Sequence, residues 1–119
     1  MMRRSCIEIL LVDKQNYLKY IPLIRIFTGE SISEIKKKIM DEIPIITFNY
    51  PVMKSFEFNN FFLTVKKIVD AGATIEIKHY TPMRMEDISM EELKNLVIRD
   101  EEIEKEIEEE RENEAIDGD

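Results

Sequence analysis

The sequence predicts an α+β domain in which helices cover one face of a three-stranded antiparallel sheet, followed by an acidic C-terminal helix. Residues 6–12 are rich in aliphatic side chains and residues 73–78 alternate strictly, and both patterns are typical of strands. Residues 58–69 instead carry apolar side chains at the 3.6-residue period of an amphipathic helix. With the turn and capping residues between these segments, the predicted order is β-α-α-β-α-β.

The first predicted elements are a strand over residues 6–12 and a short helix over residues 20–28. The apolar residues of the second segment fit either a helical or a strand period. Pro22 is tolerated in the first turn of a helix but not in its interior, and Gly29 favours a helix end. We therefore expect a helix that begins just before Pro22 and ends at Gly29.

A second helix is predicted to follow directly. Ser31 is the expected N-cap, and Glu34 stands three residues later, at the spacing of a capping box. The apolar stripe of this helix consists of Ile32, Ile35 and Ile39. Pro44 cannot continue a helix, so the helix is expected to end before it and a short strand to follow over residues 45–48.

The longest helix and a third strand complete the predicted body. The helix is unusually aromatic, and we expect at least two of its phenylalanines to be buried. These are Phe56, Phe58, Phe61 and Phe62. Gly72 is expected to end the helix in the left-handed conformation, and residues 73–78 then form a strand with one solvent-facing side.

Charge divides the chain near residue 80. Residues 1–80 have a net charge of +3 and residues 81–119 a net charge of −11. This shift predicts a folded body over residues 1–80 and an acidic, largely helical tail over residues 81–119, frayed at its end. Ser89 and Glu92 form a second capping box. The apolar stripe that follows consists of Leu93, Leu96, Val97, Ile103 and Ile107. This helix can pack on its own body or pair with another chain, and we expect its first half to dock as far as Val97.

Composition argues against several classes of function. The longest apolar run has four residues, so neither a membrane span nor a signal peptide is expected. We therefore expect a cytoplasmic protein. Cys6 is the only cysteine and His79 the only histidine, which disfavours an internal disulfide, a Cys- or His-rich metal site and most catalytic triads. We expect no catalytic, cofactor or metal residues, hence no enzyme, and the acidic block disfavours direct nucleic-acid binding.

Two strings of the chain resemble parts of one known domain. They are Thr28-Gly29-x-x-Ile32-x-Glu34-Ile35-Lys36 and Val65-Lys66-Lys67-Ile68-Val69-Asp70-Ala71-Gly72-Ala73-Thr74-Ile75-Glu76-Ile77-Lys78. Both are similar to segments of the C-terminal domain of the bacterial ribosomal stalk protein, over roughly residues 5–80. The β-α-α-β-α-β order is also that of this family. The stalk's N-terminal dimerisation segment and hinge have no counterpart here, so the chain resembles a free-standing relative.

The resemblance implies a function and a binding face. In that family the domain recruits translation GTPases through a basic face formed by its first two helices. Arg25 and Lys36 align with two basic positions of that face, and Lys37 lies beside them. The chain departs from the family at three positions where the family usually has lysine; here they are Tyr17, Pro22 and Ser33. The resemblance thus implies a non-catalytic protein-interaction module linked to the ribosome or to translation factors. A lysine run on a helix is, however, more often simply a solvated face.

Two alternative functions stay open at this point. The adaptor that hands substrates to the Clp protease belongs to the same superfamily, and it binds a client's N-terminal amine with an Asn/Asp pair after the first strand. Asp13 and Asn16 stand at the corresponding place here. The chain could also be a structural subunit of a larger assembly, with the acidic helix as its docking element. In each case the expected partner is a protein: a translation factor, the ribosome or a protease component.

Overall fold

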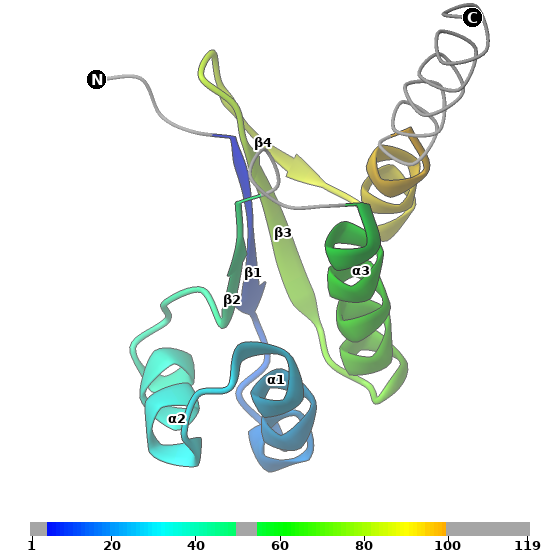
Figure 1. The fold of residues 1–119 in the computed structure, drawn as a ribbon. Coiled ribbons are helices and arrows are strands. Elements are labelled where there is room, and N and C mark those ends of the chain that lie inside the picture. Colours follow the sequence, from blue (N-terminus) through cyan, green and yellow to red (C-terminus); the bar gives the residue numbers. More distant parts are fainter. Residues whose placement is uncertain (1–4, 50–54, 100–119) are drawn as a thin grey trace, which may run out of the picture.

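A four-stranded antiparallel sheet organises the fold in the computed structural model, which describes residues 5–49 and 55–99 (Figure 1). The sheet order is β2-β1-β3-β4. The elements in chain order are β1 (Cys6–Leu11), the 3-10 helix η1 (Tyr17–Lys19), α1 (Ile21–Thr28), α2 (Ile32–Met40), β2 (Ile46–Phe48), α3 (Ser55–Asp70), β3 (Ile75–Tyr80) and β4 (Met85–Ile88). A further helix covers residues 90–99.

The α+β class is confirmed, but the prediction of three strands and of the order β-α-α-β-α-β is wrong in one respect. A fourth strand, β4, follows β3 through a tight turn in which the Thr81 backbone N–H donates to the Arg84 carbonyl over 2.9 Å. The Arg84 N–H donates in return to the Thr81 hydroxyl over 3.1 Å. β4 is only four residues long and two of them are acidic, so its sequence lacks the alternating apolar pattern of a strand.

The register of the sheet separates an inner face from an outer face. Ile9 lies opposite Ile46 on β2 and Ile77 on β3, and all three side chains are buried. The next row belongs to the outer face, where Glu8 lies opposite Lys78, and Lys78 opposite Asp87. Charges of alternating sign therefore follow one another across the outer face, and such cross-strand pairs of opposite charge stabilise neighbouring strands.

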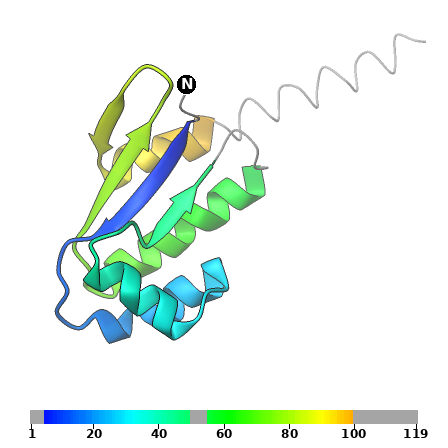
Figure 2. The ribbon, with the colours of Figure 1, turned by 90° about the vertical axis from the view of Figure 1, so that its left-hand side faces the viewer.

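The helices cover the inner face in two groups. α3 and residues 90–99 lie along the sheet, whereas α1 and α2 lie together at one end of it (Figures 1 and 2). A single apolar core joins the sheet to both groups. At its centre Phe61 of α3 stacks on Phe48 of β2 with ring centroids 4.6 Å apart and planes only 5° apart. Phe58 and Phe61 are both buried, as the aromatic pattern predicted.

Several predicted helix ends are confirmed by their stereochemistry. The Glu34 backbone N–H donates to the Ser31 hydroxyl over 3.2 Å, so Ser31 caps α2. Gly29 and Gly72 both have positive φ, 73° and 108°, and stand just beyond α1 and α3. Because left-handed backbone strains residues with a Cβ atom, glycine is the natural residue at these two helix ends.

The segment predicted to be an acidic tail begins as part of the same packing unit. Ser89 and Glu92 bond reciprocally at the start of the helix over residues 90–99, over 3.1 and 3.2 Å, as the second capping box predicted. Leu93 and Val97 are buried in the common core, so the expected docking up to Val97 is confirmed. Residue 80, the predicted boundary, lies at the end of β3 in the hairpin with β4. Ile103 and Ile107 lie outside the described residues.

No helix of the described residues is long and apolar enough to cross a membrane.

Candidate functional site: a groove between the first two helices

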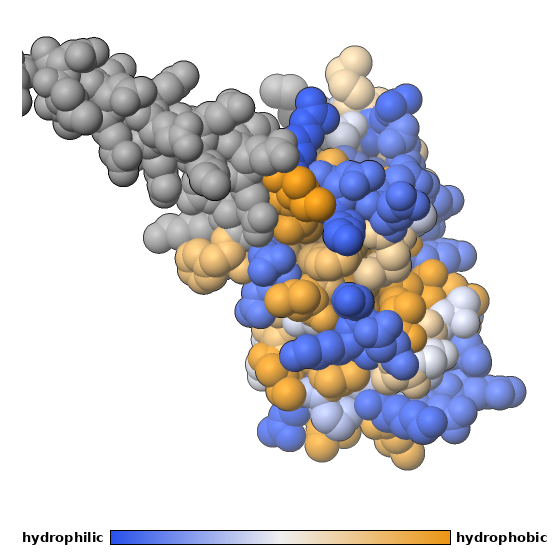
Figure 3. All heavy atoms as spheres, turned by 90° about the vertical axis from the view of Figure 1, so that its right-hand side faces the viewer, coloured by the Kyte–Doolittle hydropathy of each residue, from blue (hydrophilic) through white to orange (hydrophobic). Residues whose placement is uncertain are grey.

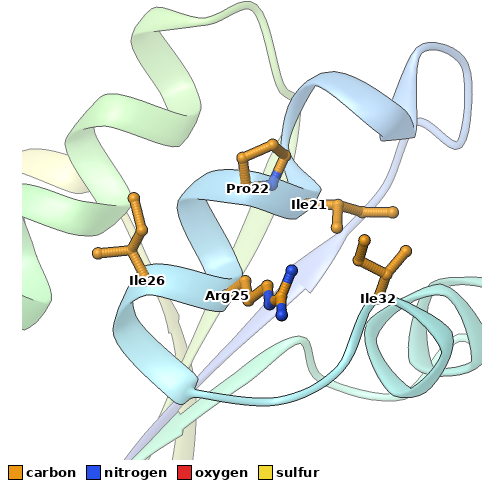
Figure 4. A pocket seen from close by; sticks show the side chains of 5 residues that line it. All are labelled: Ile21, Pro22, Arg25, Ile26 and Ile32. Carbon is orange, nitrogen blue, oxygen red and sulfur yellow. The ribbon is translucent and has the colours of Figure 1, made fainter.

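An apolar groove of about 440 Å³ lies between α1 and α2. Its lining residues are Ile21, Pro22, Arg25 and Ile26 from α1 and Ile32 from α2. Figure 4 shows Ile21 and Ile32 facing one another across the gap, with the Arg25 guanidinium extending between the two helices. The groove is therefore an apolar surface that carries one cationic group.

The groove exists because α1 has apolar side chains on both of its faces. Ile21 and Ile24 face the core and are buried. At about 100° per residue, Pro22 and Ile26 lie on the opposite side of the helix, and the Ile26 side chain is 84% exposed. Single exposed apolar residues are common on protein surfaces, but residues grouped around a concave surface are typical of interaction sites.

The three predicted basic residues, Arg25, Lys36 and Lys37, lie at different positions relative to this groove. Arg25 lines it directly. Lys36 lies one turn after Ile32 on the same side of α2, whereas Lys37 is turned about 140° away from Ile32. All three side chains are exposed, and none makes an ion pair with another residue of the described part of the chain.

Lys38, the third lysine of the run, has a different environment. Its ammonium group lies 2.6 Å from a carboxylate oxygen of Glu30, which belongs to the loop between α1 and α2, and donates to the other oxygen over 2.7 Å. This ion pair is partly buried, and it joins the loop to the last turn of α2. It also neutralises Lys38, so within the described residues Arg25, Lys36 and Lys37 are the cationic groups of α1 and α2 that have no ion pair.

Sequence reasoning found the charged part of this site but not its apolar part. In the sequence, Pro22 is only a helix signal and a departure from a basic position, and Ile32 is one member of an apolar stripe. Ile26 belongs to a segment whose apolar residues fit either period, so the period alone does not indicate its exposure. A usable signal was present, because a short helix that is apolar nearly all round cannot bury every face against one core.

A second, more polar pocket lies between the β3–β4 hairpin and the helix over residues 90–99. It has a volume of about 290 Å³ and is lined by His79, Glu86, Ile88, Glu92, Asn95, Leu96 and Arg99. His79 lies on the inner side of β3, opposite Glu86 of β4. Partial burial lowers the pKa of His79 below its ordinary value, and the negative charge of Glu86 opposes this shift. Glu86 also forms an ion pair with Arg84 over 2.7 Å.

The lowered pKa of His79 predicts that acid destabilises the fold. As the pH falls through about 6.5, the unfolded chain takes up the imidazole proton before the folded chain does, and the free energy of unfolding therefore decreases. His79 is the only histidine of the sequence, so no other imidazole contributes. Urea unfolding between about pH 8 and pH 5.5 should show this slope, and His79→Gln should flatten it. An unchanged slope in His79→Gln would contradict the prediction.

Asp13 and Asn16, the residues considered for an adaptor-like amine site, are both exposed. The Asp13 carboxylate accepts a hydrogen bond from the Gln15 N–H over 2.8 Å, within its own turn. Asn16 has positive φ, 60°, and precedes η1. Among the described residues there is also no cluster of three or more His, Cys, Asp or Glu side chains arranged to hold a metal ion.

Comparison of the chain with models of protein families, with curated proteins and with solved structures finds no match in any of the three.

Proposed function

We propose that the chain is a non-catalytic protein-interaction module and that the groove between α1 and α2 binds a segment of a partner protein. The observation that carries the proposal is the exposure of Pro22, Ile26 and Ile32 around one concave surface. Exposed apolar side chains gathered in this way gain free energy when a partner removes them from water, at about 25 cal/mol per Å². A helix face that only contacts water gains no free energy from such side chains.

The charges around the groove indicate the chemistry of the partner. Arg25 lies within the groove and Lys36 beside it, and neither is neutralised by a described residue. Residues 17–40 together have a net charge of +3. A partner segment with apolar anchors and acidic flanks would match this surface, and electrostatic attraction would speed its association. The resemblance of residues 5–80 of this chain to the stalk domain supports a link to the translation machinery. Translation factors are therefore the partners to test first.

The test is capture of partners by the tagged full-length chain, followed by measurement of affinity for the protein that is captured. Ile26→Glu should weaken that binding at least tenfold, which corresponds to about 1.4 kcal/mol, because it places a carboxylate in the apolar contact. Ile26 is so exposed that the substitution should leave the fold intact. Translation factors or ribosomal subunits among the captured proteins would support the link to translation, and Clp components would favour an adaptor.

A matched control is available on α3. Leu63 is also an exposed aliphatic residue, and Leu63→Glu introduces the same charge away from the groove. It should bind the partner like the unmodified chain. Reversing the charge of Arg25 and Lys36 together should slow association and reduce its salt dependence. Equal loss of binding in Leu63→Glu and Ile26→Glu would show that the groove is not the site.

A further inference from the structure

We propose that the groove between α1 and α2 also binds residues 101–112 of a second copy of this chain, so that copies associate head to tail. The inference rests on the proposed function in one respect, that the groove is a docking surface. It adds the identity of one occupant, which is encoded in the chain itself.

Charge complementarity is the first argument for this occupant. Residues 101–112 contain eight Glu, one Lys and one Arg, a net charge of −6. The groove offers Arg25 and Lys36, with Lys37 on the outer side of α2, and all three are exposed. Charges of opposite sign at this density favour encounter and orient the two partners.

Apolar complementarity is the second argument. The acidic run is interrupted by Ile103 and Ile107, which are four residues apart. Side chains at this spacing lie on one face whenever the segment is helical. The groove presents Ile26 and Ile32 as its exposed aliphatic residues. The segment therefore offers two aliphatic side chains to an apolar groove and carboxylates to its cationic groups.

The layout of the fold argues that the segment reaches another molecule rather than its own groove. Residue 99 is the last described residue of a helix that lies beside the N-terminal end of α3, whereas α1 and α2 lie toward its C-terminal end (Figures 1 and 2). α3 has 16 residues and is therefore about 24 Å long. Ile103 can lie at most about 14 Å from Arg99 even in a fully extended chain. The short reach of Ile103 from Arg99 therefore favours the groove of a second copy over the groove of its own chain.

A head-to-tail contact of this kind uses two different surfaces of each copy. Such contacts close as a reciprocal dimer or a larger ring where the rotation between copies permits, and otherwise build open chains as the concentration rises. The acidic segment of one copy would also cover the groove of the next, in competition with an acidic partner protein. Self-association would then keep the groove occupied until a partner of higher affinity displaces the segment.

The experiment measures self-association of the full-length chain by sedimentation velocity over a wide range of concentrations. At about 0.1 M salt, where the Debye length is about 10 Å, the chain should form oligomers, and at about 1 M salt the association should weaken at least tenfold. Two variants separate the two surfaces: Ile26→Glu blocks the groove, and Ile103→Glu with Ile107→Glu blocks the segment. Each variant alone should be monomeric. An equimolar mixture should form a heterodimer and nothing larger, because only one groove and one segment remain competent.

Leu63→Glu is the control and should associate like the unmodified chain. A monomer at every concentration and salt, or a mixture of the two variants that stays monomeric, would overturn the inference. A monomer in which Ile103→Glu with Ile107→Glu changes the NMR signals of α1 and α2 would show docking within one chain and would also overturn it. If self-association is absent while partner binding still depends on Ile26, only this inference fails. If neither depends on Ile26, the proposed function fails as well.

Discussion

A chain shortened to residues 1–80 is expected to lose cooperative folding, whereas a chain shortened to residues 1–99 should keep it. The shorter chain lacks β4, which pairs with β3, and it lacks the helix that places Leu93 and Val97 in the core. Leu93 is 0% exposed, and burial of each such side chain contributes about 1.5–3 kcal/mol. Because small domains are stable by only about 5–15 kcal/mol, loss of the whole element removes a large part of that margin.

Thermal and urea unfolding of the two shortened chains would test this prediction. The chain of residues 1–99 should show a single sharp transition. The chain of residues 1–80 should show a broad transition or a fluctuating state that binds a hydrophobic dye. Similar sharp transitions in both chains would mean that residues 5–80 are a complete folding unit and that residues 81–99 are not needed for cooperative folding.

The elements that could be predicted from the sequence are those defined by local stereochemistry. Ser31 and Glu34 predicted the start of α2, since a capping box needs only residues three apart. Gly29 and Gly72 predicted two helix ends, because their backbone conformation excludes most other residues. Ser89 predicted the start of the last helix for the same reason as Ser31. In each case the information lies within four residues of the chain.

The features that could not be predicted depend on which surfaces meet in the folded chain. β4 is a strand because the Thr81–Arg84 turn brings it beside β3, and its own four residues are too polar to indicate this. Likewise, Arg25 was identified as a candidate from a resemblance, but the exposure of Ile26 follows only from the face of α1 that packs on the core. The charge change near residue 80 was a real feature of the composition, yet the packing continues past it to Val97.

The aromatic cluster between β2 and α3 gives the second large expected effect. Phe61 is 0% exposed, it stacks on Phe48, and its ring centroid lies 5.9 Å from that of Phe27 at the end of α1. Phe61→Ala should lower the free energy of unfolding by about 3–5 kcal/mol, because it opens a cavity where the sheet, α1 and α3 meet. Phe56→Ala is the matched control: Phe56 belongs to the same helix but is 67% exposed, and its loss should change stability by no more than about 0.5 kcal/mol. Urea unfolding measures both values, and a difference between the two variants below about 1 kcal/mol would mean that Phe61 is not central to the core.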